Sequence, residues 1–253
     1  MDRSLLVALL VGVLQGVLEW LPVSSEGNLT VVLAALGTPT DAAVGFSLFV
    51  HLGTACSATV YYRSEVADLL GRVPAWRPDR AFEGEQATVT FLAVGTLVSG
   101  VVGVAAYATL DRLVDELTGG AVVVLVGVLL VATGLLQRLS ADAAVGRAAP
   151  DPLDAVLVGA AQGVAILPGV SRSGMTTGTL LLRGHEGSAA FRLSFLLSIP
   201  AAVGGAAIAY LDTGLGEVTA LGAALALLAA FLVGLAAVDA LLRVVERVSF
   251  WAV

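Results

Sequence analysis

The sequence is poor in charge. Of its 253 residues, 13% are charged and 58% are hydrophobic, whereas a soluble domain typically carries about 25% charged residues. Lysine is missing altogether, so all 13 basic residues are arginine, and the formal net charge is −7. An acidic chain lacks the basic surface that binding to nucleic acid requires. The composition therefore excludes an ordinary soluble domain, and we expect no nucleic-acid partner.

Cysteine is nearly absent as well. The single residue, Cys56, excludes a disulfide within the chain and a metal cluster built on thiolates. The N-terminal segment resembles a signal peptide in that Arg3 precedes an apolar stretch. It has no A-x-A cleavage site, however, and polar Gln15 and Glu19 lie at its end. We therefore treat it as part of the mature protein.

Long uncharged stretches are what the sequence does have. Each is about as long as the 20 or so apolar residues that a membrane-spanning helix needs. Only helices and closed barrels satisfy their backbone groups inside a bilayer, and these stretches lack the alternation of barrel strands. We predict an all-α polytopic protein of the cell membrane, with the bilayer around it. The predicted spans are 42–62, 86–110, 117–137, 193–211 and 218–238.

The arginines predict an orientation, because cytoplasmic loops carry an excess of basic residues. Loops 63–85 and 138–154 contain arginines and are placed inside, whereas the acidic loops 111–116 and 212–217 are placed outside. Region 155–182 must then begin and end inside, although it is too short to cross the bilayer twice. It is predicted to be a re-entrant helical hairpin.

Region 4–40 is predicted to be a second re-entrant hairpin, entering from the outer side, because its sequence recurs later in the chain. Gln15-Gly16-Val17 recurs as Gln162-Gly163-Val164, Leu21-Pro22 as Leu167-Pro168, and Val23-Ser24 as Val170-Ser171. Repeat 1 would span 4–137 and repeat 2 155–253, the second with two spans where the first has three. The three spans of the first copy invert the second copy, as in many transporters.

Both predicted hairpins contain charge, and charge at membrane depth is functional by default. Hairpin 4–40 contains only Glu19 and Glu26, and hairpin 155–182 contains only Arg172. A helix N-terminus favours an anion, and the planar guanidinium fork of arginine suits phosphate oxygens. A carboxylate beside an anion is explained if a divalent cation, Mg²⁺ or Ca²⁺, bridges them. The sequence therefore predicts an anion site where the two hairpins meet.

Polar and small residues around these charges are the candidate substrate-binding groups. Plainer explanations exist, since hydroxyls in apolar helices often bond to backbone carbonyls and a Glu–Arg pair can be an ion pair alone. His51 is a candidate proton carrier, whereas His185 is expected to be solvated and Trp20 to be an interfacial anchor. The remaining candidates are Gln15, Ser24, Gly27, Asn28, Gly169, Ser171, Ser173, Gly174, Thr176 and Thr177.

At these residues the chain resembles the undecaprenyl-diphosphatase family, the BacA-type integral membrane phosphatases that recycle polyprenyl lipid carriers. The resemblance rests on segments 15–25 and 168–176 and extends through 51–54 and 191–200. It implies an inverted-repeat fold with two re-entrant hairpins and a site open to the outer face. It also implies metal-dependent removal of the terminal phosphate from a polyprenyl diphosphate. The acidic, lysine-free composition is typical of a salt-loving, archaeal member.

Several roles follow from the resemblance, residue by residue. Glu19 matches the second carboxylate of the family's (Glu/Gln)-x-x-x-Glu motif and Gln15 its first position, which makes both candidate metal ligands. Ser25 matches the serine proposed as nucleophile, and Arg172 matches the phosphate-binding arginine. Attack by metal-bound water stays open as an alternative.

One departure from the family pattern concerns Glu26-Gly27-Asn28, which stands where the family usually has Ser-Gly-His. Asparagine takes up no proton at neutral pH, so Glu26 becomes a candidate substitute base or metal ligand. The sequence thus predicts a phosphatase that regenerates the lipid monophosphate. The alternatives are a transporter or flippase of the same lipid, and a non-catalytic lipid-binding relative. A homodimer is compatible with the sequence.

Overall fold

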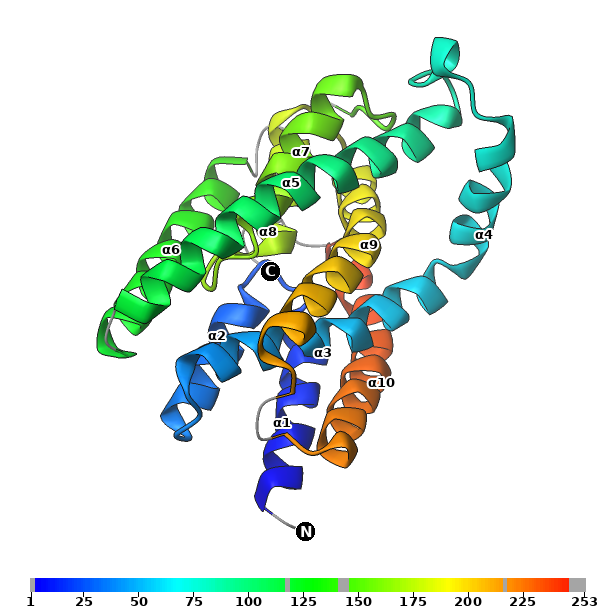
Figure 1. Ribbon diagram of the computed structural model, residues 1–253. Coiled ribbons are helices and arrows are strands. Elements are labelled where there is room, and N and C mark those ends of the chain that lie inside the picture. Colours follow the sequence, from blue (N-terminus) through cyan, green and yellow to red (C-terminus); the bar gives the residue numbers. More distant parts are fainter. Residues whose placement is uncertain (1–2, 117–118, 141–145, 216–217, 246–253) are drawn as a thin grey trace.

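The computed structural model describes residues 3–116, 119–140, 146–215 and 218–245 (Figure 1). Over these residues the chain is helical and contains no β-strand. The helices are α1 (Arg3–Leu18), α2 (Ser25–Ala35), α3 (Thr40–Tyr61), α4 (Arg63–Arg72), α5 (Gln86–Glu116), α6 (Gly119–Ser140), α7 (Pro152–Val164), α8 (Arg172–Leu182), α9 (Gly187–Thr213) and α10 (Ala220–Val245), with short 3-10 turns at Val73–Ala75 and Pro78–Arg80.

Five of these helices, α3, α5, α6, α9 and α10, are long and apolar enough to cross a membrane. They confirm the predicted all-α polytopic class. Their ends differ most from the predicted spans in three places. Segment 111–116 continues α5 instead of forming a loop, α9 begins at Gly187 instead of 193, and α10 continues to Val245 instead of ending at 238. A charge can lie within α9 because Arg192 is paired with Glu65 of α4.

The remaining long segments are two broken helix pairs, which we call the first hairpin (α1 and α2) and the second hairpin (α7 and α8). In each, the helix stops at a short non-helical elbow, residues 19–24 and 165–171. The two ends of the second hairpin are joined, since Arg147 N donates to Gly184 O and Glu186 N to Arg147 O, both at 2.9 Å. This arrangement is compatible with the predicted re-entrant hairpins.

Packing between helices follows the proposed repeat. Helix α1 packs along α10, α7 packs along α5, and α3 packs against α9 (Figure 1). Close approach is allowed by small residues at matching positions. A Cβ on Gly12 would lie 2.2 Å from the backbone oxygen of Ala226, and one on Gly159 would lie 2.7 Å from that of Gly95. Each hairpin therefore packs on a span of the opposite repeat, and this brings the two elbows together.

Trp20 lies in the first elbow and was wrongly predicted to be an interfacial anchor. It is 1% exposed, its indole N–H donates to Gly234 O at 2.9 Å, and its ring meets the edge of Phe195. The helix ends just before Trp20, so the turning chain carries the ring inward between α9 and α10. A buried Trp needs a partner for its N–H, and α10 provides one.

Candidate active site

A serine caps the helix that follows each elbow. Ser24 Oγ accepts from Gly27 N at 3.0 Å, and Ser171 Oγ accepts from Gly174 N at 3.1 Å. Such caps satisfy backbone donors that the first helical turn leaves free. They fix α2 to begin at Ser25 and α8 to begin at Arg172, so the two candidate reacting groups occupy equivalent first positions.

The two elbows also hold each other. Gly169 N donates to Ser24 Oγ at 3.1 Å, and Ser173 Oγ donates to Leu21 O at 2.8 Å. Gly27 has no room for a side chain, since a Cβ there would lie 2.6 Å from Gly169 N, and Gly169 itself has a φ of +97°. These residues position the site, and a direct contact with substrate stays a prediction for them.

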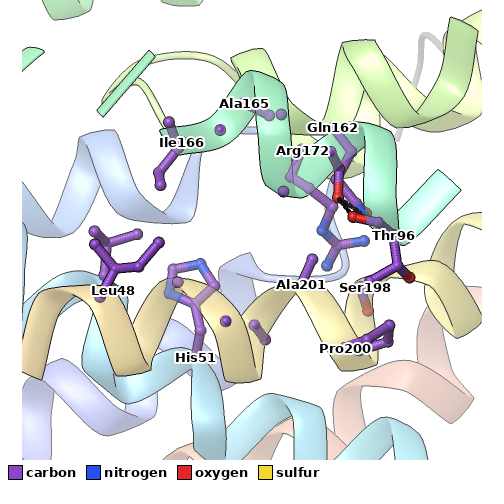
Figure 2. A pocket seen from close by; sticks show the side chains of 18 of the residues that line it. Leu48, His51, Thr96, Gln162, Ala165, Ile166, Arg172, Ser198, Pro200 and Ala201 are labelled. Carbon is purple, nitrogen blue, oxygen red and sulfur yellow. Dashed lines mark hydrogen bonds between the residues drawn. The ribbon is translucent and has the colours of Figure 1, made fainter. Parts of the chain in front are cut away.

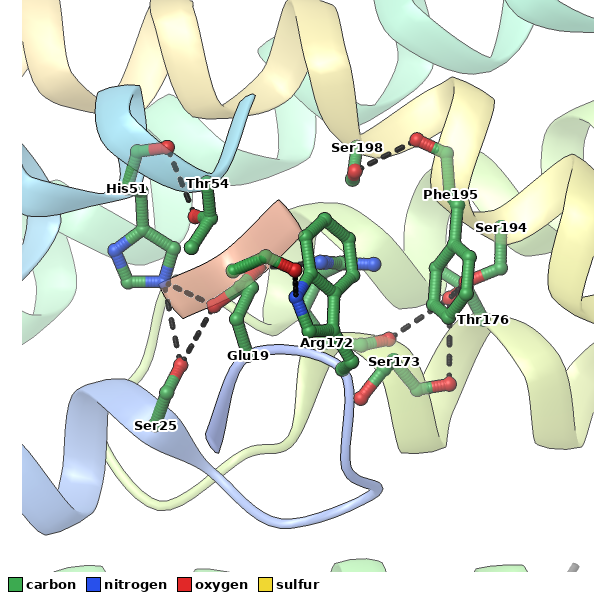
Figure 3. Close-up of polar contacts among 12 residues, drawn as sticks. Glu19, Ser25, His51, Thr54, Arg172, Ser173, Thr176, Ser194, Phe195 and Ser198 are labelled. Carbon is green, nitrogen blue, oxygen red and sulfur yellow. Dashed lines mark hydrogen bonds and ion pairs between the residues drawn. The ribbon is translucent and has the colours of Figure 1, made fainter. Parts of the chain in front are cut away.

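Glu19 lies at the centre of the predicted site and is 6% exposed. Its Oε1 pairs with Arg172 Nη2. Its Oε2 accepts from Gln15 Nε2 and from Ser25 Oγ, each at 2.8 Å, and lies 3.1 Å from His51 Nε2. Figure 3 shows Glu19, Ser25 and His51 facing one another beside Arg172. The structure thus brings together the residues that the sequence placed in two distant hairpins.

His51 of α3 places an imidazole beside Ser25 and Glu19. Its Nδ1 lies 2.7 Å from Ser47 O, so Nδ1 carries a proton there, and its Nε2 faces Ser25 Oγ at 3.5 Å. Asn28 instead donates through Nδ2 to Ser24 O at 2.8 Å. The family's usual histidine at position 28 is therefore replaced by an amide that binds its own helix, while an imidazole remains beside the serine.

Several buried polar atoms at the site have no partner among the described residues. These atoms are Gln15 Oε1, Glu26 Oε1, Arg172 Nη1 and Thr177 Oγ1. A buried polar group without a partner costs about 1–3 kcal/mol, so such groups commonly await a ligand or water. Thr176 differs, because its Oγ1 lies 2.6 Å from Ser194 Oγ of α9 and donates to Arg172 O.

A cavity of about 180 Å³ opens beside the cluster. Figure 2 shows His51 and Arg172 reaching into it from opposite sides. Glu19 and Glu26 contribute the other charges of its lining. Sequence reasoning missed a group of polar lining residues on α5, α7 and α9, although the repeat pairs one of them with Gln15. These residues are Thr96, Ser99, Gln162 and Ser198.

The site suits a divalent cation only in part. Within the described segments no three His, Cys, Asp or Glu side chains are grouped closely enough to hold a metal ion alone. Gln15 bonds to Glu19 through Nε2, and Glu26 lines the same cavity as Glu19. Each has one unpartnered side-chain oxygen, and hard cations prefer such oxygen donors. Mg²⁺ commonly takes its remaining ligands from phosphates and water. The donor set therefore fits a cation shared with a bound phosphate.

A second charged cluster lies at the other end of the second hairpin. Asp154 is fully buried and accepts from Arg183 Nε at 2.7 Å and Arg147 Nη2 at 3.1 Å. His185 is also fully buried, with Nε2 2.9 Å from Asp154 Oδ2. The prediction that His185 is solvated was wrong, because the loop after α8 is hydrogen-bonded to Arg147 and brings the ring against Asp154 of α7. Burial alone would raise the pKa of Asp154, but the hydrogen bonds from Arg183 and His185 hold it below its ordinary value.

Fold and geometry together define a polytopic membrane protein with a buried cluster of charged and hydroxyl side chains beside a cavity. The chain belongs to the family described as Bacitracin resistance protein BacA, whose pattern matches residues 8–253. This confirms the predicted family.

Curated relatives match the chain along nearly its whole length. The undecaprenyl-diphosphatase of Haloarcula marismortui is 50% identical over 253 residues, which cover 99% of this chain and 93% of the relative. The undecaprenyl-diphosphatase of Methanococcoides burtonii is 38% identical, covering 98% and 93%. That of Methanothrix thermoacetophila is 39% identical, covering 97% and 91%. The first of these relatives is haloarchaeal, in agreement with the composition.

Proposed function

We propose that this protein removes the terminal phosphate of a polyprenyl diphosphate of the undecaprenyl diphosphate kind and regenerates the lipid monophosphate. The observation that carries the proposal is the full-length similarity to relatives named undecaprenyl-diphosphatase, at up to 50% identity. The hydrogen bond from Ser25 Oγ to Glu19 Oε2 supports hydrolysis over transport, because a carrier that only binds a headgroup has no use for a serine bonded to a base.

In the proposed reaction Arg172 binds the terminal phosphate. Its Nη1 has no partner among the described residues and its Nη2 pairs with Glu19, so the guanidinium has donors to spare for phosphate oxygens. Phosphoryl transfer is catalysed chiefly by positioning and charge stabilisation. Arg172 is therefore the residue we expect to contribute most to stabilising the transition state.

Ser25 is the proposed nucleophile. Its Oγ forms a bond to the terminal phosphorus, the bond from that phosphorus to the bridging oxygen breaks, and the lipid monophosphate leaves. The hydroxyl proton passes to Glu19, which already accepts it in a hydrogen bond, or to His51 beside it. Water then attacks the phosphoserine, releasing phosphate and restoring the hydroxyl. Direct attack by water is the alternative, with Ser25 only orienting the phosphate.

Two charged groups assist in this proposal. Glu26 is 5% exposed and lines the cavity with one oxygen unpartnered, so it is placed to hold a proton or a cation. A Mg²⁺ or Ca²⁺ ion held by Glu19 and Gln15 would neutralise the charge of the diphosphate when bound. The protein is a multi-pass membrane protein, and we propose that it lies in the plasma membrane with its site open toward the outer face.

Phosphate release from prenyl diphosphates of 15 to 55 carbons is the direct test of this function. We expect the purified protein to release phosphate with Mg²⁺ or Ca²⁺ and to stop when EDTA removes the ion. Movement of labelled lipid across vesicles without phosphate release would instead establish the transporter. Lipid binding with neither activity would establish the non-catalytic relative.

A further inference from the structure

Helix α6 lies at the edge of the molecule and has one buried polar face (Figure 1). Elsewhere its surface is apolar, and Val131 and Leu139 are 74% and 66% exposed. The buried polar residues are Thr133, Gln137 and Ser140, whose spacing of four and three residues places them on one side of a helix. Helix α6 packs against α8 and α2, the second helices of the two hairpins. An otherwise apolar spanning helix thus turns its polar side chains toward the hairpins.

Gln137 reaches the backbone of the first elbow. Its Nε2 donates to Pro22 O at 2.5 Å. The preceding carbonyl, Leu21 O, accepts from Ser173 Oγ of α8 at 2.8 Å. Carbonyls in a non-helical turn lack the partner that a helix would give them, and a buried carbonyl without a partner is destabilising. Two consecutive carbonyls of the first elbow are therefore held by donors from α6 and α8.

The same amide group occupies the space beside Gly174, which lies in the first turn of α8. A Cβ on Gly174 would lie 2.1 Å from Gln137 Nε2. The second elbow also lies close against α6, since a Cβ on Gly169 would lie 2.5 Å from Val126 O. Gln137 therefore contacts both hairpins at once, and it keeps its bond to the first hairpin only while position 174 has no side chain.

Both contacts of Gln137 lie next to the charged cluster. Pro22 is three residues from Glu19 and three from Ser25 along the chain, and position 174 is two residues after Arg172. The cluster itself joins the two hairpins, because Glu19 pairs with Arg172. A shift of the first elbow would therefore move Ser25 relative to a phosphate bound at Arg172. A misplacement of about 1 Å in an active site can cost about 10²-fold in rate.

We infer that Gln137 is a positioning residue of the active site, which holds the first elbow in register with α8 so that Ser25 stays aligned with the phosphate bound at Arg172. It acts through the backbone of the elbow and not on the substrate. Gly174 leaves the space in which the amide of Gln137 lies. The inference rests on the proposed function, since the step that it concerns is phosphate transfer.

The first test is Gln137→Met, which keeps the length of the side chain and removes the N–H donor. We expect kcat for farnesyl diphosphate to fall about 10–100-fold. KM should change by less than about 3-fold, because Arg172 still binds the phosphate. The matched control is Thr133→Val, which removes a buried hydroxyl from the same face of α6, where Thr133 Oγ1 donates to Leu129 O at 2.9 Å. The kcat of the control should equal that of the wild type.

Gly174→Ala tests the same contact from α8, and it also serves if Gln137→Met does not fold. The added methyl group would push the amide of Gln137 away from Pro22 O, so kcat should fall about 10-fold or more. In a chain that already carries Gln137→Ala, the same change should leave kcat where Gln137→Ala put it, because the contact is already lost. Losses that multiply in the double variant would overturn the inference.

A lowered Tm in Gln137→Met with wild-type kcat per folded molecule would also overturn it, because Gln137 would then only stabilise the fold. Hydrogen exchange of the backbone amides in segment 19–28 separates this inference from the proposed function. If the wild type hydrolyses no prenyl diphosphate, the proposed function fails and exchange alone decides. Faster exchange in Gln137→Met than in the wild type and Thr133→Val would support the inference, and unchanged exchange would overturn it.

Discussion

The two hairpins share a framework and differ in where they carry charge. In the first hairpin Glu19 lies in the elbow and Glu26 just after it, and Glu19 pairs with Arg172, the first residue after the opposite elbow. In the second hairpin the other charges lie at the far end, where Asp154 and Arg183 tie the end of α8 to the start of α7. The repeat thus provides two matching elbows, and charge placement gives each hairpin a separate task.

From this difference we expect the elbows to serve catalysis and the far end of the second hairpin to serve stability. The ends of the first hairpin that lie away from the elbow, at Arg3 and Gly37, border a cavity of about 540 Å³ together with Val218. In the described part of the chain no ion pair joins these two ends. The second hairpin is held by ion pairs that bury Asp154 completely. Damage at the elbows should therefore remove activity, whereas damage at the far end of the second hairpin should remove stability.

The largest effect is expected from Ser25, which directly follows the first elbow, and its neighbour Ser24 serves as the control. Loss of a nucleophile should lower turnover by at least about 10³-fold in Ser25→Ala. Ser24→Ala removes only a cap and the tie to Gly169, and should cost about 1 kcal/mol of stability with turnover nearly intact. Phosphate release and thermal unfolding of both variants check this. Full activity in Ser25→Ala would leave attack by water as the mechanism.

At the far end of the second hairpin, Asp154→Asn should mainly destabilise the protein. Removing one partner of a buried ionic network costs about 3–5 kcal/mol, which thermal unfolding in detergent would show as a lowered Tm. Because the pKa of Asp154 is lowered in the folded protein, its stabilisation is complete above the unfolded value of about 3.9 and is lost as pH falls below it.

The wild type should therefore lose part of its stability between about pH 4 and more acidic conditions, and Asp154→Asn should lose less over the same range. Turnover per folded molecule near neutral pH should match the wild type. A variant with wild-type stability but little turnover would show that this cluster belongs to the chemistry and that the division between the hairpins is wrong.

The smallest effect is expected from Asn28→His, which restores the residue usual in the family. Since His51 already places a ring nitrogen 3.5 Å from Ser25, a second imidazole should change kcat by no more than about 3-fold, far below the 10²–10⁴-fold of a needed acid or base. His51→Gln in the same assay is the comparison. A large gain in kcat from Asn28→His would mean that His51 does not act as the acid or base beside Ser25.

Much of this architecture could be predicted from the sequence because membrane helices are recognisable from charge alone. The five spans, the two hairpins and the meeting of Glu19, Ser25 and Arg172 follow from uncharged runs, the repeat and the family motifs. What failed depended on partners far away in the chain. Each predicted span was bounded by charged residues, so the predicted start of α9 came after Arg192 and was too late. Arg192 can lie within the helix because it is paired with Glu65, and no local sequence pattern shows that pair.

The same reason explains the wrong predictions for single residues. From the sequence alone His185 is a loop residue and Trp20 is an interfacial anchor. Only the contacts of His185 with Asp154 and of Trp20 with α10 show that both are buried. The division between serines was equally hidden, since Ser24 and Ser25 are adjacent and only the cap shows which one is free to react. The repeat did contain one unused signal, the equivalence of Gln162 with Gln15.

The central claim is that the elbows perform the chemistry and the far end of the second hairpin only anchors it. Arg172→Ala and Arg183→Ala test it directly. Arg172 is the first residue of α8 and Arg183 is its C-cap, so the two variants each remove one arginine, at opposite ends of the same helix. Phosphate release per folded molecule is the measurement. We expect a loss of at least about 10²-fold for Arg172→Ala and wild-type turnover with a lowered Tm for Arg183→Ala. Similar turnover in the two variants would contradict the account.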